Sequence, residues 1–315
     1  MKKLFIVAAA FCLPLAALAQ DDLLAELEKQ DSAVAKENIT IATFKSTRVI
    51  NMNSTEITGL NNLQFMIIHH FGSLWDNTES TGANFARLFG MNAGFANTYM
   101  SFDYTPVRWM NLGFAFAGDI NLEGTAKFKI MRQQTGKRNY PVSIAWVSTA
   151  RVNASSKEPP QDDLVWNKFS YLNQMLIARK FSNAFSLQLV PSMIHYNLVP
   201  YGSANSNTTW SIGIGGRMKI TEKTAITFEY NRQLNNYENV IDKTGEIVSY
   251  SPNLISLGYD WDTGGHIFQF FFSNSTFASN IPQLTVNPEK ENIGQWCIGF
   301  NLNRSYALKK TVKIE

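Results

Sequence analysis

The chain has little cysteine, little charge and no long apolar run in its main part. Only 2 of its 315 residues are cysteine, and Cys12 falls in the apolar N-terminal stretch, so Cys297 alone remains beyond it and no disulfide within that part is possible. Charged residues make up 17%, against about 25% in a typical domain. After the N-terminal stretch no apolar run approaches the roughly 18 residues of a spanning helix. These absences exclude a disulfide-rich secreted domain and a helical membrane protein.

The N-terminus has the pattern of a secretory signal peptide. Lys2 and Lys3 give a basic start, residues 4–16 are apolar, and residues 17–19 read Ala-Leu-Ala, which is a small-x-small cleavage pattern. We therefore expect residues 1–19 to be a signal peptide, 20–45 a short periplasmic N-terminal segment, 46–308 the main domain and 309–315 a C-terminal tail.

Short segments that alternate apolar and polar residues fill the rest of the chain. In residues 122–130, Glu123, Thr125, Lys127 and Lys129 alternate with mainly apolar residues. A period of two is typical of a strand with one apolar face. An exported chain of such segments, 13% of whose residues are aromatic, predicts an all-β fold: a transmembrane antiparallel up-and-down β-barrel of about 12 strands in the outer membrane.

The connections between the candidate strands alternate in length. Short turns fall near Asn183, Glu222 and Gly264, while long polar loops cover residues 73–97, 154–170, 200–207, 235–252 and 277–293. A barrel has short periplasmic turns and long outer loops, whereas a soluble β-sandwich has no reason to segregate its loop lengths. The candidate strands are residues 63–71, 98–107, 110–120, 122–133, 140–153, 171–181, 184–198, 208–220, 224–234, 253–261, 266–276 and 294–306.

The alternation also predicts which side chains face the lumen. A charge that faces lipid at mid-depth costs about 2–4 kcal/mol, so the charged face of each strand must point inward. Two interpretations stay open: a structural ladder of ion pairs in a closed lumen, or a charged constriction that selects a solute. The lumen candidates are Glu123, Lys127, Lys129, Arg217, Lys219, Glu229, Asp260 and Asp262.

Four glycines share the inward face: Gly213, Gly215, Gly258 and Gly299. Because a glycine has no side chain, these positions leave space inside the barrel, and either a channel or another segment must occupy it. The β-prone residues 39–50 are the candidate for such a plug, and residues 51–62, rich in Asn, Ser and Thr, are expected to form a loop.

No strong catalytic pattern is present. An outer-membrane phospholipase would need Ser, His and an Asn or Asp together on the outer wall of the barrel. His195 with Ser192, or His266 near Ser273, could be imagined, but neither pair has a diagnostic spacing. We therefore expect no enzyme.

Metal, cofactor and nucleic-acid sites are not indicated either. His69 and His70 are adjacent, so on a regular strand they point to opposite faces and cannot bind one metal ion. Removal of the signal peptide leaves 26 basic and 25 acidic residues, and no basic block suggests nucleic acid. Cys297 lies in an alternating segment and is expected to be a small strand residue rather than a reactive thiol.

Six stretches span most of the mature chain and mark strand ends and turns rather than an active site: residues 47–56, 67–72, 176–182, 215–221, 263–275 and 299–304. Together they resemble a family of uncharacterised Gram-negative outer-membrane barrels, a domain of unknown function. The resemblance implies a barrel and no assigned activity.

Three functional hypotheses follow. The first is a narrow passive channel or solute-binding transport barrel for small polar or charged molecules, in which Lys127, Lys129, Arg217 and Lys219 attract anionic groups while the acidic lumen residues temper that selectivity. The second is a sealed structural barrel that docks a periplasmic protein partner through residues 21–38. The third is an outer-membrane lipid hydrolase. In each case we expect a monomer in contact with outer-membrane lipid, without a cofactor.

Overall fold

The structure, a computed structural model, describes most of the chain from residue 37 onward. The predicted signal peptide, residues 20–36 and the tail 309–315 lie outside the described residues. In the part that is described, no helix is long and apolar enough to cross a membrane. The described residues are 37–75, 79–88, 97–118, 121–136, 138–154, 165–199, 206–235, 237–241, 247–250, 253–285 and 296–308.

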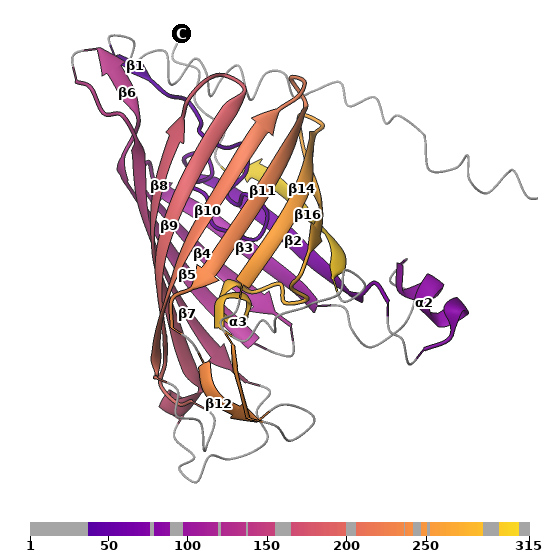
Figure 1. Ribbon diagram of the computed structural model, residues 1–315. Coiled ribbons are helices and arrows are strands. Elements are labelled where there is room, and N and C mark those ends of the chain that lie inside the picture. Colours follow the sequence, from indigo (N-terminus) through magenta and orange to yellow (C-terminus); the bar gives the residue numbers. More distant parts are fainter. Residues whose placement is uncertain are drawn as a thin grey trace, which may run out of the picture. The chain divides into compact units, whose positions relative to one another are not determined.

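Twelve antiparallel strands close into one barrel (Figure 1). Each strand pairs with its neighbours along the chain, and β16 pairs with β2 to close the barrel, so the predicted up-and-down topology is confirmed. Every predicted strand segment corresponds to one of these strands. They are β2 (Asn62–Ser73), β3 (Asn97–Val107), β4 (Met110–Ala117), β5 (Asn121–Met131), β7 (Ser143–Asn153), β8 (Phe169–Lys180), β9 (Phe185–Tyr196), β10 (Thr208–Lys219), β11 (Thr224–Gln233), β14 (Asn253–Asp262), β15 (Ile267–Ser273) and β16 (Cys297–Ala307).

Two small sheets stand apart from the barrel, and the sequence did not predict them. β1 (Glu37–Ile39) pairs with β6 (Gln134–Gly136), and β12 (Tyr237–Ile241) pairs with β13 (Ile247–Tyr250). The first sheet ties the chain just before the barrel to the connection between β5 and β7. The second lies within the long connection between β11 and β14.

The two ends of the barrel differ in their connections. We name as the turn end the one that carries the short turns at residues 108–109, 181–184, 220–223 and 263–266, and the opposite one as the loop end. The predicted alternation has two exceptions, because the connection from β4 to β5 at the loop end is also short and the connection from β5 to β7 at the turn end, residues 132–142, is long. The longer connections at the loop end carry α2 (Thr81–Leu88), the 3-10 turn η1 (Val165–Lys168) and α3 (Asn280–Thr285) (Figure 1).

The barrel wall is apolar outside and polar inside, as the alternation predicts. On β10, Trp210 and Ile212 are 51% and 40% exposed, whereas the intervening Ser211 is 2% exposed. The same alternation holds on β14, where Leu257 is 56% exposed and Asp260 is 2% exposed. Since the outer surface is the apolar one, it suits contact with lipid.

This alternation predicts a depth-dependent cost for charges on the outer wall. Leu257→Lys, at the middle of β14, should destabilise the folded barrel by about 2–4 kcal/mol, because the ammonium would face hydrocarbon. Ile226→Lys, also outward but close to the turn end, should cost less than about 1 kcal/mol. Urea unfolding of each variant in lipid vesicles measures the difference, and equal costs at the two positions would contradict the assigned faces.

Candidate functional site

All eight predicted lumen residues lie on the inward side of the wall. Some are fully buried, such as Glu229 at 1% and Lys127 at 3% exposure, and others lie nearer the turn end, where Lys219 contacts Glu222 of the adjacent turn. Arg217 of β10 pairs with Asp260 of β14 at 3.1 Å. Their part in selecting a solute stays a prediction.

The lumen is filled from the turn end by a segment of the chain that precedes the first barrel strand. We call residues 43–58 the N-terminal plug. Phe44, Val49, Ile50 and Met52 are at most 2% exposed, and the polar Ser46, Arg48 and Asn51 between them are also buried. The predicted plug, residues 39–50, covers the first half of this segment. Asn51 and the residues that follow it up to residue 58 were expected to form a loop, but they lie in the lumen as well. The expected boundary between the periplasmic segment and the main domain, between residues 45 and 46, falls inside the plug.

The centre of the plug is a tight hairpin. Val49 N donates to Met52 O at 2.9 Å, and Ser54 N donates to Thr47 O at 3.0 Å. These bonds leave the N–H groups at the tip of the hairpin without partners inside the plug. A buried main-chain polar group without a partner is costly, so the wall has to provide the missing bonds.

Glu229 of β11 satisfies the tip of this hairpin. Its carboxylate accepts hydrogen bonds from three successive main-chain N–H groups: Ile50 at 2.7 Å, Asn51 at 3.1 Å and Met52 at 2.7 Å. Hydrogen bonds to a charged acceptor are stronger than those between neutral groups. The carboxylate therefore binds the turn of the plug in the way that a protein nest binds an anion.

Lys127 of β5 makes the complementary contacts with carbonyl groups. Its ammonium donates to Thr47 O at 3.1 Å, Ser54 O at 3.0 Å and Glu56 O at 3.0 Å. An ammonium has three protons, so this arrangement uses its full donor capacity. One wall anion thus binds the amide groups of the plug, and one wall cation binds its carbonyl groups.

Side-chain amides of the wall complete the main-chain contacts of the plug. Gln188 accepts from Thr55 N at 3.0 Å and donates to Asn53 O at 2.7 Å, so it pairs with the plug almost as a neighbouring strand would. Gln188 was not among the predicted lumen residues, although its inward register could have identified it. The further contacts are Gln269 Nε2 to Val49 O at 2.6 Å, Asn301 Nδ2 to Ile50 O at 2.7 Å and Asn53 Nδ2 to Gln174 Oε1 at 2.8 Å.

Inward glycines make room for the apolar side chains of the plug. A Cβ atom at Gly213 would lie 2.7 Å from Met52 Cε, one at Gly215 would lie 3.1 Å from Met52 Sδ, and one at Gly258 would lie 3.0 Å from Ile50. At these three positions the plug therefore fills the space inside the barrel. The sequence alone left two possible occupants of this space, a channel or another segment of the chain. The fourth glycine, at position 299, lies instead against a phenylalanine ring of β15.

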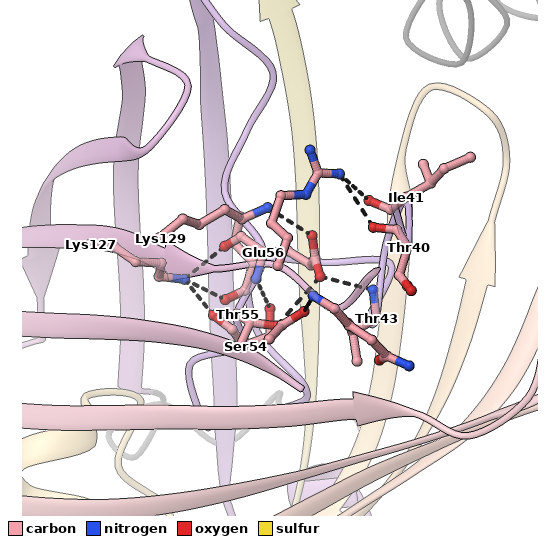
Figure 2. A network of polar contacts seen from close by, with 12 residues as sticks. Thr40, Ile41, Thr43, Ser54, Thr55, Glu56, Lys127 and Lys129 are labelled. Atoms are coloured by element: carbon pink, nitrogen blue, oxygen red, sulfur yellow. Dashed lines mark hydrogen bonds and ion pairs between the residues drawn. The ribbon is translucent and has the colours of Figure 1, made fainter. Parts of the chain in front are cut away.

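The start of the plug is held at the turn end by ion pairs (Figure 2). Glu56 accepts from Thr43 N at 2.9 Å and pairs with Lys129 at 3.3 Å. Lys45 pairs with Asp262 at 2.8 Å. Lys129 and Asp262, two more of the predicted lumen residues, therefore contact the plug.

A second segment fills the lumen from the loop end. Residues 274–285, which follow β15 and include α3, turn inward, and all six residues of α3 are buried. Ile281 and Leu284 pack with Leu172 and Ile194 of the wall. Ser279 hydrogen-bonds Glu123, another predicted lumen residue. The sequence predicted only a long polar loop here, because the segment is polar and its apolar residues are few.

The two filling segments are linked through His70 of β2. Its Nε2 lies 3.0 Å from Asn51 Oδ1 in the plug, and its Nδ1 lies 2.9 Å from Ser275 O in the loop-end segment. A cavity of about 20 Å³ remains between the plug, the wall and α3, lined by Arg48, Lys127 and Ile281 among others. This is room for about one water molecule.

Neither imagined catalytic pair is assembled. His195 hydrogen-bonds Thr208 at 2.8 Å, whereas Ser192 points inward and accepts from Gln174 in the lumen. Ser273 and His266 lie at opposite ends of β15. Within the described residues, no group of three or more His, Cys, Asp or Glu side chains is placed to hold a metal ion.

Removing the charge of Glu229 should loosen the plug. In Glu229→Gln the three N–H groups lose a charged acceptor, and such bonds contribute about 1.5–3 kcal/mol. We expect at least a tenfold faster reaction of a water-soluble maleimide with a cysteine placed by Met52→Cys in a Cys297→Ser background. Glu222→Gln, which changes an exposed turn residue, is the matched control. Equal labelling rates in the two variants would contradict the role of Glu229.

The Glu56 contact predicts a pH dependence. Burial opposes ionisation of Glu56, but Lys129 and the N–H groups of Thr43 and Phe44 outweigh it and hold its pKa below the usual value. The contribution to stability is therefore present above the ordinary carboxylate pKa of about 4.3 and is lost as the pH falls through the lowered pKa. The stability difference between the parent and Glu56→Gln, measured by thermal unfolding, should be constant above about pH 5 and vanish in stronger acid. A difference that persists in strong acid would contradict this assignment.

Comparison with known proteins found similar chains among solved structures. Among solved structures, the chain is similar to the NanC porin (6% identity over 78% of this chain and 100% of that chain, TM-score 0.44). It is also similar to a FadL homologue of Pseudomonas aeruginosa (10% identity, 85% and 94% coverage, TM-score 0.39) and to the CymD monoaromatic hydrocarbon channel (11% identity, 80% and 90% coverage, TM-score 0.35). No curated protein sequence matches the chain.

The family match covers the plug and the barrel together. The model described as "Membrane bound beta barrel domain (DUF5777)" matches residues 44–306. This range begins at the second residue of the plug and ends in the last strand. The chain therefore belongs to this family of membrane-bound β-barrel domains.

Proposed function

We propose that the protein is an outer-membrane barrel, closed at rest by its own N-terminal plug, that passes small polar or charged solutes when the plug leaves the lumen. The membrane-bound family and the apolar outer wall support a membrane location, and the expected signal peptide supports the outer membrane. The observation that carries the proposal is the main-chain contact of the plug with Glu229 and Lys127. We propose no catalytic activity.

A permanently open channel fits the filled lumen poorly. The cavity beside Arg48 has a volume of about 20 Å³, which holds about one water molecule and leaves no room for a solute. Passage therefore requires movement of the plug, of the loop-end segment or of both.

The polarity of the wall favours a removable plug over permanent packing. A lumen closed for good could be filled by apolar side chains, which avoid the desolvation cost of buried charges. Here the plug faces ionisable groups and side-chain amides, among them Glu229, Lys127, Gln188 and Asn301. Water can replace the plug at each of these groups, so the wall can stay folded around an aqueous lumen.

The charge of the opened lumen should be nearly balanced. Four of the eight lumen candidates are basic and four are acidic. Arg217 and Asp260 would stay paired after the plug leaves, because both belong to the wall. Lys127, Lys129, Glu229 and Asp262 would lose their plug partners and become the charges available to a solute. We therefore propose weak ion selectivity for the opened barrel.

A sealed barrel that docks a periplasmic partner is the second candidate function. It is favoured by the same filled lumen, and by the β1–β6 pairing that ties the chain before the plug to the turn end. In this case residues 21–38 would bind the partner while the barrel stays closed. A monomeric state and the nature of the partner remain predictions.

Single-channel recording in planar bilayers tests the proposal. The unmodified protein should be silent apart from rare events, whereas Glu229→Gln combined with Lys127→Met should give frequent conductance steps, because the plug loses both charged contacts. In that variant, Arg217→Glu with Lys219→Glu should shift the selectivity toward cations. Glu222→Gln serves as the control that keeps the plug contacts.

Two results would overturn the proposal. Continuous conductance of the unmodified protein would mean that the plug does not close the barrel. Silence of the plug variant, with its folding verified by heat-dependent migration on gels, would favour the sealed barrel that docks a partner.

A further inference from the structure

The turn end of the barrel carries basic residues without acidic counterparts. Three carboxylates of this end already have lysine partners: Glu222 with Lys219, Asp262 with Lys45 and Glu56 with Lys129. Five other basic residues of this end take part in none of the ion pairs found among the described residues. We call these residues the basic collar: Arg108, Arg138, Arg179, Lys223 and Arg304.

Two members of the collar lie on the lipid-facing side of the wall, each over an aromatic ring. The guanidinium carbon of Arg304 lies 4.9 Å from the ring centre of Tyr306, and that of Arg179 lies 5.2 Å from the ring centre of Phe181. The rings are 43% and 56% exposed, so they face outward. A guanidinium over an aromatic face is held by a cation–π interaction and keeps most of its N–H groups available.

Arg304 is held from a second side. Its Nη1 lies 3.2 Å from Nε2 of His266, which belongs to the turn between β14 and β15. Since arginine is always a donor, His266 accepts this bond with an unprotonated Nε2. The guanidinium is thereby fixed between the turn and the ring of Tyr306.

The position of Arg304 fits the membrane interface. It comes directly after Asn303, which pairs with the first residue of β15, and so lies level with the turn. An outward arginine costs about 2–4 kcal/mol at mid-depth but about 0–1 kcal/mol near the interface. Trp261 and Phe268, with ring centres 5.9 Å apart, lie on the neighbouring strands at this end. Aromatic rings are typical of the level at which lipid headgroups begin.

We propose that Arg304, positioned by His266 and Tyr306, binds the phosphate of an anionic phospholipid in the leaflet at the turn end, and that the rest of the basic collar adds attraction for the same leaflet. The lipid-facing position commits the site to a headgroup rather than to free phosphate. The inference does not depend on whether the barrel conducts solutes.

Lipid-dependent fluorescence quenching tests this site. The protein is folded into phosphatidylcholine vesicles that contain either brominated phosphatidylglycerol or brominated phosphatidylcholine in equal fraction, and quenching of tryptophan is measured. Subtracting the signal of the same protein with Trp261→Phe isolates the ring near the site. We expect about a fivefold preference for phosphatidylglycerol, which corresponds to about 1 kcal/mol per basic residue near an anionic surface, and a smaller preference at high salt.

The matched variants decide whether Arg304 is responsible. Arg304→Gln should lose most of the preference. Arg232→Gln, which changes an exposed arginine near the opposite end of the wall, should keep it. Equal quenching by the two lipids, or an unchanged preference in Arg304→Gln with its barrel verified as folded, would overturn the proposal.

Discussion

The structure depends on the need of every main-chain polar group in a dry environment for a hydrogen-bond partner. In the wall this need is met by twelve strands that close on themselves, so no strand edge faces lipid. Inside the barrel the same need reappears, because the plug is a hairpin too small to satisfy its own N–H and C=O groups. Glu229 and Lys127 meet it from the wall.

This constraint changes the meaning of the lumen charges. Viewed in the sequence, a set of acidic and basic residues facing one lumen suggests either cross-barrel ion pairs or a filter. Arg217 and Asp260 form such a pair. Glu229 and Lys127, however, are bonded to main-chain groups of another segment, an arrangement that neither interpretation contained. Their charge serves to bind peptide groups in the closed state and becomes available to a solute only after the plug has left.

The wall could be predicted from the sequence because its determinants are local. A strand with one face in lipid and one in a polar lumen has a period of two, and all twelve strands were located from this period. The plug could be predicted only in part. The inward Gly213 and Gly258 indicated unfilled space, but glycine alone does not identify what fills it. The hairpin at Asn51 and Met52 reads as an ordinary polar loop, because most of its wall partners lie at least 70 residues away along the chain, on strands such as β5, β9 and β11. The inward turn of α3 could not be predicted either, because its partners on the wall are also distant in the sequence.

Recognition of main-chain groups has a consequence for how the plug sequence can vary. Lys127, Gln269 and Asn301 contact carbonyl groups, which every residue type possesses, and Glu229 contacts N–H groups, which every residue type except proline possesses. Much of the plug could therefore be exchanged without loss of these bonds, provided that the chain keeps its tight turn and that the side chains facing Gly213, Gly215 and Gly258 still fit. At these positions the lumen recognises the shape of a backbone, whereas side-chain contacts such as Lys45 with Asp262 and Asn53 with Gln174 still constrain the sequence of the plug.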